Sequence, residues 1–318
     1  MKRIAVLTSG GDSPGMNAAI RSTVRAATFN DVECIGVMRG YEGLIDGEYV
    51  PMDRSSVGGI IHKGGTILKT ARSERFKTEE GRAAALAKMK EAGIEGLVVI
   101  GGDGSFHGAK LLDAAGMPTI GVPGTIDTDI AGTDTTIGFD TAVNTALDAV
   151  MKLRDTASSH DRLFIVEVMG RNAGFLALEV AVATGAEYVI VPELPVSIGK
   201  LCEMLREAHA RKKNHIIIIL AEGVMTANEM KDRLQDTGGY EARVTVLGYI
   251  QRGGGPTSYD TILASRMGAY ATESLLIGKR GVMVGSVSGR MVLSDLERSW
   301  TERKSLNPEL LDLMGKLN

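Results

Sequence analysis

Short apolar runs alternate along the chain with longer stretches in which apolar and polar positions recur at helical spacing. Such runs are typical of strands that are buried on both faces of a largely parallel sheet. They predict strands at residues 4–7, 97–100, 163–168, 188–191 and 216–220. The amphipathic stretches predict helices at residues 79–92, 141–153, 200–212 and 261–276. The alternation of strands with helices predicts an α/β fold.

Size and composition narrow the class of protein. A chain of 318 residues is long enough for two lobes. Because no Pro-rich or Ser-rich linker divides it, we expect the chain to cross between the lobes more than once. With 44% hydrophobic and 24% charged residues, the composition is that of an ordinary globular protein and does not indicate a disordered chain.

Charge, cysteines and hydropathy weigh against several other classes. A formal net charge of −3 provides no overall basic field for nucleic acid. Cys34 and Cys202 are too few for a zinc site or a disulfide framework. The sequence begins without the apolar stretch of a signal peptide, and no apolar run reaches the length of a membrane span. We therefore expect a cytoplasmic protein that does not cross a membrane.

Two segments share one design, in which an apolar strand leads into Gly-Gly-Asp and then into a helix. They are VLTSGGDSPGMNAA at residues 6–19 and VVIGGDGSFHGAK at residues 98–110. Glycines there let the backbone approach a ligand closely, and the amides at the helix start then face an anion. A glycine at such a turn often only makes the turn, but two turns with an acid at the same offset favour phosphate binding.

Phosphoryl transfer explains these turns better than other nucleotide chemistry. Neither GxxxxGK[ST] nor GxGxxG occurs, so a Walker-type NTPase and a dinucleotide fold are not supported. Transfer of a phosphoryl group needs a phosphate cradle, a carboxylate for Mg²⁺, positive charge and a base for the acceptor hydroxyl. Gly102, Gly104 and Ser105 fit the cradle, and Asp103 fits the metal.

The acid-rich segment PGTIDTDIAGTDTTIGFDTA at residues 123–142 is the candidate for the base. Its aspartates are Asp127, Asp129, Asp134 and Asp140. Acids so close together repel one another unless a cation offsets them. A solvated turn with a helix cap is the alternative, since Thr and Asp are good N-caps. The segment follows a buried strand, where ligands of α/β sheets bind, and this favours a site.

Two further segments place an arginine beside glycines after an apolar run. They are MGRNAG at residues 169–174 and LGYIQRGGGP at residues 247–256. This arrangement suits bidentate recognition of phosphate by Arg171 and Arg252, although a single surface arginine is more often only solvated.

Together these segments resemble, in order, the motifs of bacterial ATP-dependent 6-phosphofructokinases. The resemblance rests on LTSGGDSPGMNAAIR, IGGDGS, PGTIDTDI, RDTASSHDR, VEVMGRNAG, LAEGVM and VLGYIQRGGGP. It extends to about residue 287, and the tail beyond looks idiosyncratic. It implies two lobes, each a mostly parallel sheet flanked by helices, with the active site in the cleft between them. The lobes would comprise residues 1–138 with about 251–301, and residues 139–250 with about 302–318.

The resemblance also implies the reaction and its residues. A γ-phosphoryl group would pass from MgATP to the 1-hydroxyl of fructose 6-phosphate, as a step of glycolysis. The catalytic residues would be Asp127 as the base, with Thr125, Asp129, Arg171, Arg72 and Gly11. ATP would be held by Gly11, Arg72, Gly102, Asp103, Gly104 and Ser105, with Asp103 near Mg²⁺. The sugar phosphate would be held by Thr125, Ile126, Asp127, Arg162, Met169, Gly170, Arg171, Glu222, Arg243, Tyr249 and Arg252.

Assembly and regulation are further implications of the resemblance. The family is typically a homotetramer, in which Arg162 and Arg243 come from a neighbouring subunit. An effector site for ADP or GDP as activator, or phosphoenolpyruvate as inhibitor, would be formed by Arg21, Arg25, Arg54, Arg154, Gly185, Glu187, Arg211, Lys213 and His215. Without the resemblance, the basic run at residues 211–215 would be a solvated helix end.

Four positions depart from the family pattern and keep rival interpretations open. Thr128 replaces an asparagine, Tyr249 a histidine, Phe175 an aspartate and Gly59 an acid. These changes allow a catalytically impaired regulator that only binds sugar phosphate or nucleotide. Another kinase that shares GGDG, such as an NAD or lipid kinase, is a second rival, but it would not explain the MGR, TIDxD and IQRGG segments together. Pyrophosphate-dependent relatives are a third, but they typically carry a bulkier acid at the position of Gly104 and a lysine at that of Gly124. Glycine at both positions favours ATP.

Overall fold

The computed structural model describes residues 1–160, 162–211, 213 and 215–317. The chain forms two compact units, and each is described separately below. Unit 1 comprises Met1–Thr141 and Arg252–Lys304, and unit 2 comprises Ala142–Gln251 and Ser305–Asn318. The chain therefore passes from one unit to the other at three places along the sequence.

Unit 1 contains a seven-stranded sheet in the order β11-β10-β5-β4-β1-β2-β3. The five inner strands are parallel, and the two edge strands run antiparallel to their neighbours. The bounds are β1 (Arg3–Thr8), β2 (Glu33–Val37), β3 (Tyr49–Met52), β4 (Gly96–Gly101), β5 (Thr119–Pro123), β10 (Val282–Val287) and β11 (Arg290–Asp295).

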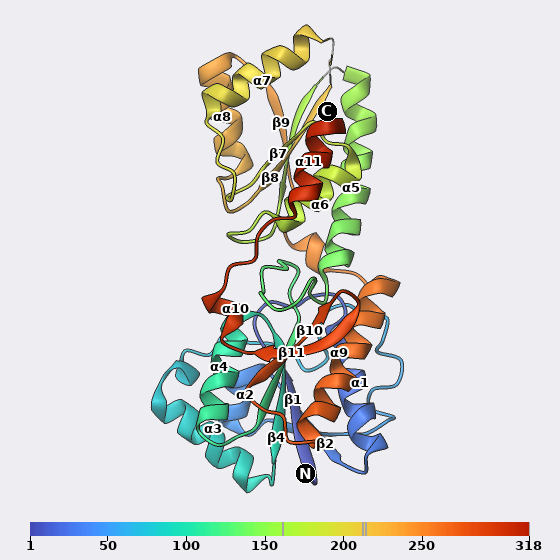
Figure 1. Cartoon of the computed structure of the whole chain (residues 1–318), viewed down its shortest axis with the longest axis vertical. Helices are drawn as coiled ribbons and strands as arrows, with labels where there is room; N and C mark the ends of the chain where they lie inside the picture. Colours follow the sequence, from blue (N-terminus) through green and yellow to red (C-terminus); the bar gives the residue numbers. More distant parts are fainter. Residues whose placement is uncertain (161, 212, 214, 318) are drawn as a thin grey trace. The chain divides into compact units, whose positions relative to one another are not determined.

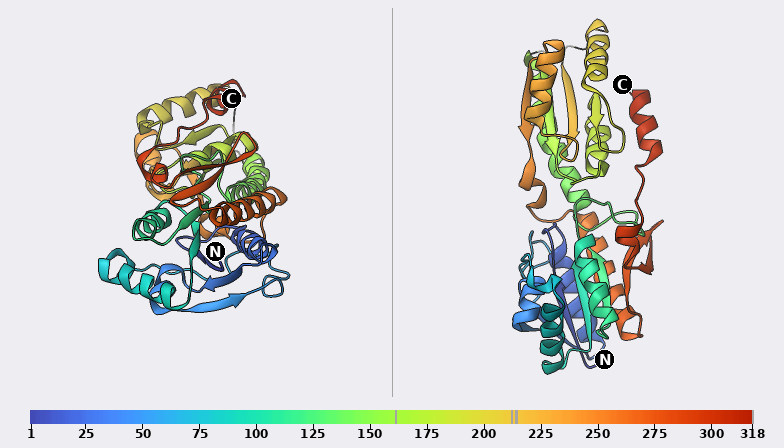
Figure 2. Two further views of the ribbon diagram at one scale, coloured as in Figure 1. Left: turned by 60° about the horizontal axis from the view of Figure 1, so that its bottom comes forward. Right: turned by 90° about the vertical axis from the view of Figure 1, so that its left-hand side faces the viewer.

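Helices cover both faces of this sheet. On one face α1 (Met16–Phe29) and α9 (Ser258–Leu276) lie side by side, coloured blue and orange in Figures 1 and 2. The other helical elements of unit 1 are α2 (Gly40–Asp46), η1 (Arg75–Lys77), α3 (Glu79–Glu91), α4 (Asp103–Ala114) and α10 (Arg298–Thr301). Successive residues of a strand point to opposite faces, so the central strands need apolar side chains at every position.

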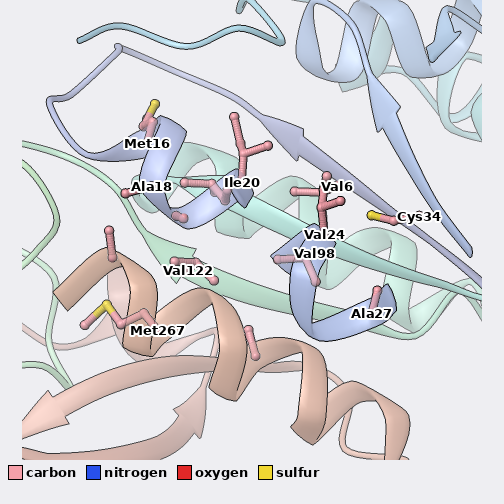
Figure 3. Packing of buried hydrophobic residues seen from close by; sticks show 14 of the residues in the cluster. Val6, Met16, Ala18, Ile20, Val24, Ala27, Cys34, Val98, Val122 and Met267 are labelled. Carbon is pink, nitrogen blue, oxygen red and sulfur yellow. The ribbon is translucent and has the colours of Figure 1, made fainter. Parts of the chain in front are cut away.

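Two separate cores follow from this alternation. In β4, Val98 packs in the core beneath α1 and α9, together with Ile20 and Met267 (Figure 3). The next residue, Val99, packs in the opposite core with Phe106 of α4. This two-sided burial explains why the sequence shows continuous apolar runs rather than an alternating pattern.

Unit 2 contains a four-stranded parallel sheet in the order β7-β8-β6-β9. Its strands are β6 (Leu163–Val168), β7 (Tyr188–Ile190), β8 (Ile216–Ala221) and β9 (Ala242–Val246). Its helical elements are α5 (Phe139–His160), which starts in unit 1, α6 (Phe175–Thr184), α7 (Ile198–Ala210), α8 (Ala227–Gly238), η2 (Gly248–Arg252) and α11 (Pro308–Leu317). The core beneath α7 and α8 contains Leu201, Leu205, Met230 and Leu234.

The strands and helices expected from the sequence are all present. The fold is α/β, with two mostly parallel sheets flanked by helices, as predicted. The largest difference concerns α5, which begins at Phe139 and continues to His160, beyond the expected end at Leu153. The expected helix at residues 200–212 ends at Ala210 as α7, and Lys212 lies outside the described residues. None of the helices in the described part of the chain has the length and hydrophobicity needed to span a membrane.

Candidate functional site

The candidate residues of unit 1 follow three neighbouring parallel strands. Because β4 lies between β1 and β5, the loops after these three strands leave the same edge of the sheet. Backbone bonds continue past the strand ends: the Ser9 amide donates to the Ile100 carbonyl (2.9 Å) and the Gly124 amide to the Gly101 carbonyl (3.0 Å). Ligands of parallel α/β sheets bind at this edge.

The first turn of α4 has the form of a phosphate cradle. Gly102 is the N-cap and Asp103 the first helical residue, and no side chain caps this helix start, which is the kind of end where an anion can bind. A Cβ at Gly101 would lie 2.5 Å from the Ser9 carbonyl oxygen, which only glycine avoids. At Gly104 a Cβ would meet nothing within 4 Å, so this position faces open space.

Asp103 fits a magnesium ion that arrives with the nucleotide. Mg²⁺ in such sites is usually held by one or two carboxylates together with substrate phosphate oxygens. Within the described residues, no group of three or more His, Cys, Asp and Glu side chains forms a metal site on its own. Asp103, beside the open position at Gly104, is the residue that would hold such an ion.

The turn after β1 is joined to the segment that carries Arg72. The Thr70 hydroxyl donates to the Gly10 carbonyl (2.8 Å), and Arg72 follows two residues later with an exposed side chain. A Cβ at Gly11 would lie 3.2 Å from the guanidinium carbon of Arg252. The structure thus brings two expected site arginines to the Gly10–Gly11 turn, one through its segment and one through its guanidinium.

A buried tyrosine that sequence reasoning missed supports the α4 turn. The Tyr41 hydroxyl donates to the Ser105 carbonyl, and its ring stacks on Phe76 with centroids 4.1 Å apart. Gly108 allows this packing, since a Cβ there would lie 2.8 Å from the Tyr41 ring. Burial raises the pKa of Tyr41, so the hydroxyl keeps its proton as a donor. No motif in the sequence marks this residue.

The loop that carries Asp127 is closed on itself by threonine hydroxyls. The hydroxyls of Thr128 and Thr136 are 2.9 Å apart, and the Thr136 amide donates to the Thr128 hydroxyl oxygen (3.0 Å). The Thr136 hydroxyl also donates to the Thr125 carbonyl (2.6 Å). Thr128 has φ +54°, a left-handed conformation that β-branched residues rarely adopt. Asp127 itself is only 4% exposed, and Asp129 is half-buried.

The four acids of this segment do not form one cluster. Asp134 is exposed and accepts the Ser288 amide (2.7 Å). Asp140 accepts the Thr257 hydroxyl (2.5 Å), and Thr257 is the N-cap of α9. Each of these two acids binds another segment, which is a structural role different from the solvated turn and helix cap that were the alternative. Only Asp127 and Asp129 remain as candidates for chemistry.

The Asp127 loop ends in a buried polar network around Asp260. Its carboxylate accepts the amides of Gly138 (2.9 Å) and Thr141 (2.8 Å) and the Thr141 hydroxyl (2.6 Å). The Asp260 side chain is completely buried, and desolvation raises its pKa. This network joins the start of α5 to the start of α9.

The MGRNAG turn of unit 2 contains a residue in a strained backbone conformation, and a neighbouring carboxylate binds the amides of the turn. Glu222 accepts the amides of Gly170 (3.2 Å) and Arg171 (2.8 Å) through the same oxygen. Arg171 has φ +51°, and Gly223 lies so close that a Cβ there would be 2.1 Å from the Arg171 carbonyl. Met169 is buried, whereas the side chains of Arg171 and Tyr249 are exposed, Tyr249 to 78%.

Two expected sugar-phosphate residues lie far from this turn. Arg162 immediately precedes β6 and Arg243 pairs with Phe164 at the start of the same strand, whereas Met169 follows its other end. At about 3.3 Å per residue, the strand separates the two ends by roughly 20 Å. Arg162 and Arg243 of one chain therefore do not join Met169 and Arg171 of the same chain around one small ligand.

The expected effector residues fall into two sets. In unit 1 a cavity of about 380 Å³ is lined by Arg21, Arg25 and Arg54 together with Phe29 and Glu273. Desolvation and the neighbouring charge of Arg25 lower the pKa of Arg21, as expected where cations gather before an anion binds.

The second set belongs to unit 2. Arg154 donates to the Gly185 carbonyl (2.6 Å) and lies 3.9 Å from the Glu187 carboxylate. Glu187 also accepts the Ile217 amide (2.8 Å), which connects it to the start of β8. Arg211, Lys213 and His215 lie in the segment between α7 and β8, close in sequence to Ile217.

Known proteins resemble this chain over its whole length. The family model described as phosphofructokinase matches residues 3–275. An ATP-dependent 6-phosphofructokinase 1 of Thermus thermophilus is 56% identical over 320 residues, covering 98% of each chain. An ATP-dependent 6-phosphofructokinase of Halalkalibacterium halodurans is 53% identical and covers 100% of both chains. The likeness therefore does not end near residue 287, and the expectation of an idiosyncratic tail was wrong.

Solved structures agree with the sequence comparisons. Phosphofructokinase from Saccharomyces cerevisiae matches with a TM-score of 0.89 and 35% identity over 99% of this chain, which spans 50% of the yeast chain. A pyrophosphate-dependent phosphofructokinase from Marinobacter aquaeolei, at 21% identity and a TM-score of 0.85, shares the fold. With a family model that matches residues 3–275 and relatives that are 53% and 56% identical over the chain, the chain belongs to the phosphofructokinase family.

Proposed function

We propose that the chain is an ATP-dependent 6-phosphofructokinase acting in the cytoplasm. It transfers the γ-phosphoryl group of MgATP to the 1-hydroxyl of fructose 6-phosphate and releases fructose 1,6-bisphosphate and ADP. The observation that carries the proposal is the common sheet edge in unit 1, where the α4 turn and the Asp127 loop leave adjacent strands. A phosphate cradle beside a fixed carboxylate is the minimum arrangement for transfer to an alcohol.

In this assignment the α4 turn binds the nucleotide phosphates. The amides at the start of α4 and the Ser105 hydroxyl hold the phosphate oxygens, and Asp103 holds the associated Mg²⁺. When bound, the metal offsets charge on the phosphate oxygens. Gly11 and Arg72 approach the phosphates from the turn after β1, to which the Arg72 segment is joined through Thr70.

The open space at Gly104 favours a nucleotide over pyrophosphate as the donor. No atom lies within 4 Å of the position that a Cβ would take there, so the turn has room for a larger ligand. A Cβ at Gly124 would lie 3.1 Å from Ile100 and 3.2 Å from Met16, so this glycine sits in a tight contact. A lysine at Gly124 would have to displace two buried side chains.

Asp127 acts as the general base toward the 1-hydroxyl of the sugar. A carboxylate that is nearly buried and fixed by its loop can take the proton as the oxygen attacks the γ-phosphorus. Thr125, Ile126 and Asp129 stand beside it in the same loop and orient the acceptor end of the sugar. Positive charge from Arg171 and Arg72 stabilises the charge of the transferring group.

Unit 2 and Arg252 supply the sugar-phosphate contacts. Met169, Gly170 and Glu222 form the turn that orients Arg171, and Tyr249 donates to the 6-phosphate in place of a histidine. Arg162 and Arg243 lie at the opposite end of β6. We therefore assign them to the sugar phosphate of a neighbouring copy, in a homotetramer whose active sites are completed between subunits.

The effector site, like the active site, is completed by residues of two subunits in this proposal. The arginines around the cavity of unit 1 bind the phosphates of ADP, GDP or phosphoenolpyruvate. Arg154, Gly185, Glu187, Arg211, Lys213 and His215 form the complementary half on another subunit. Gly59 stands where the family pattern has an acid, so only its backbone can contact an effector. Its φ is +66°, and no atom lies within 4 Å of the position of a Cβ.

A coupled assay tests the reaction directly. Product formation is measured with fructose 6-phosphate and Mg²⁺, with either ATP or pyrophosphate as the donor. We expect turnover with ATP and at least about 100-fold less with pyrophosphate, because pyrophosphate lacks the nucleoside part and the contacts that it makes. Turnover with pyrophosphate alone would exclude the ATP assignment, and binding of fructose 6-phosphate without turnover would favour the impaired regulator.

A further inference from the structure

The segment after β11 attaches to both parts of the candidate site in unit 1. We call residues 296–304 the C-terminal strap. It lies beyond the match to the family model, which ends at residue 275, and no sequence motif marks it. The strap contacts both α4 and the Asp127 loop, and nothing in the sequence indicated these contacts.

One end of the strap packs on α4. Leu296 is completely buried in the core that contains Phe106, and the Trp300 ring lies 4.6 Å from the His107 ring, centroid to centroid. Lys110 of α4 binds Asp295 (2.9 Å), the last residue of β11, and Glu297 (3.2 Å) at the start of the strap. The strap is therefore fixed on the helix whose first turn is the phosphate cradle.

The other end reaches the loop that carries Asp127. The Lys304 ammonium donates to the Thr128 carbonyl (3.1 Å) and to the Asp134 carbonyl (2.5 Å). These two carbonyls belong to residues that are six positions apart, so one side chain joins two parts of the loop. The Thr128 carbonyl belongs to the peptide unit between Thr128 and Asp129, so this bond holds the backbone between the two acids Asp127 and Asp129.

The conformation of Thr128 makes this contact consequential. A threonine at φ +54° occupies a sparsely populated region and persists only if its surroundings hold it there. The hydroxyl of Thr128 is bound by Thr136, and its carbonyl is bound by Lys304. The ammonium also places a positive charge on a loop with three aspartates, Asp127, Asp129 and Asp134, which would otherwise repel one another.

We propose that Lys304 is a positioning residue for the proposed phosphoryl transfer, which holds the Asp127 loop through the carbonyls of Thr128 and Asp134. The lysine does not touch the substrate in this assignment and acts only through Asp127. The C-terminal strap thereby connects the placement of the base to the helix that binds the nucleotide phosphates. This inference rests on the proposed function.

The test compares Lys304→Met with a matched surface variant, Lys316→Met, which removes an exposed lysine paired with Asp312 on α11. For Lys304→Met we expect kcat to fall by about 10- to 100-fold, because small displacements of a reacting group cost this much. The KM values for ATP and fructose 6-phosphate should change by less than about 2-fold. Lys304→Arg, which keeps charge and donors, should recover part of kcat. Wild-type kcat in Lys304→Met would overturn the proposal.

A double variant separates positioning from a general loss of structure. If Lys304 acts through Asp127, Lys304→Met should cause little further loss in an Asp127→Ser background, because the group it positions is gone. An equal fold-loss in both backgrounds would refute action through Asp127. If Lys304→Met does not fold, the same cycle is measured with Lys304→Arg, with the same two outcomes.

Two readouts do not depend on activity. Hydrogen exchange of residues 125–136 should become faster in Lys304→Met than in Lys316→Met, and Trp300, the one tryptophan of the chain, should show changed fluorescence quenching. Unchanged exchange in the loop would contradict the proposal even if turnover fell. An inactive wild type would instead refute the proposed function, and exchange would still decide whether Lys304 holds the loop.

Discussion

The first turn of α4 and the loop after β5 leave adjacent strands of one sheet but are held in different ways. The α4 turn is formed by glycines, with open space at Gly104 and support from Tyr41 behind it. The β5 loop is closed by the Thr128–Thr136 contact and by Lys304. Under the proposed function the difference matches their tasks, because a turn that receives phosphate needs room for its ligand, whereas a base must keep one position.

Loss of the base should have the largest effect. Asp127→Ser is expected to lower kcat by about 10³-fold or more, since a positioned general base contributes roughly 10²–10⁴-fold. The KM values should change much less, because the carboxylate acts on the chemical step. Steady-state kinetics with ATP and fructose 6-phosphate measure both.

Asp31→Asn is the control for Asp127→Ser. Asp31 is an exposed turn residue with φ +55°, a conformation that asparagine tolerates, so kinetics should stay at wild-type values. If Asp127→Ser keeps wild-type turnover, another group takes the proton and the β5 loop is not the base loop.

The open turn should be the next most sensitive place. Gly104→Asp adds a carboxylate where no atom lies within 4 Å, so the fold should tolerate it. The new charge would face the phosphates of ATP, and we expect the KM for ATP to rise by about 10-fold or more, equivalent to about 1.4 kcal/mol. The thermal midpoint should stay within a few degrees of the wild type.

Gly199→Asp is the matched control for this prediction. Gly199 is the second residue of α7, as Gly104 is of α4, and it also has no atom within 4 Å of a Cβ position. An acid there should leave the KM for ATP unchanged. A KM that responds equally to both substitutions would mean that the α4 turn is not the nucleotide site.

The sequence predicted the open turn more fully than the closed loop. Glycines after an apolar strand point directly to a phosphate turn, and Gly102 and Asp103 are where the pattern placed them. The supports of the loop come from distant parts of the chain: Asp260 lies 122 residues from Gly138, and Lys304 lies 176 residues from Thr128. A lysine or an aspartate without a local pattern gives no signal in one sequence, so these partners emerged only from the fold.

The same limit applies to the four acids of residues 123–142. Their spacing indicated a single cluster, but Asp134 and Asp140 bind Ser288 and Thr257, which are far away in the sequence. Local composition showed that the segment was special. It did not separate the two acids available for chemistry from the two that hold the structure.

Removal of one hydroxyl should weaken the closed loop by an intermediate amount. Thr128→Val keeps the side-chain shape but leaves the buried Thr136 amide without its acceptor. An unsatisfied buried group costs about 1–3 kcal/mol, so the free energy of unfolding should fall by this amount in denaturant titrations. The exposed residue Thr237, changed to Val, should show less than about 0.5 kcal/mol. Equal stability of the two variants would show that the hydroxyl contact does not hold the loop.

The smallest effect is a dependence of the free energy of unfolding on pH, which comes from Asp260 beside the end of the Asp127 loop. Desolvation raises the folded-state pKa of Asp260 above its unfolded value, so the folded state binds more protons between these two values. The contribution of Asp260 to stability therefore decreases as pH rises through that range. The pH dependence contributed by Asp295 has the opposite sign, because the Glu297 amide and the Lys110 side chain lower the pKa of Asp295, and its contribution to stability is lost as pH falls.

Unfolding free energies of Asp260→Asn and Asp295→Asn, each compared with the wild type from pH 3 to pH 7, should show this contrast. The loss caused by Asp260→Asn should shrink as pH rises, whereas that caused by Asp295→Asn should grow. If both losses change in the same direction, the carboxylate at the end of the loop is not desolvated in the way that its burial implies.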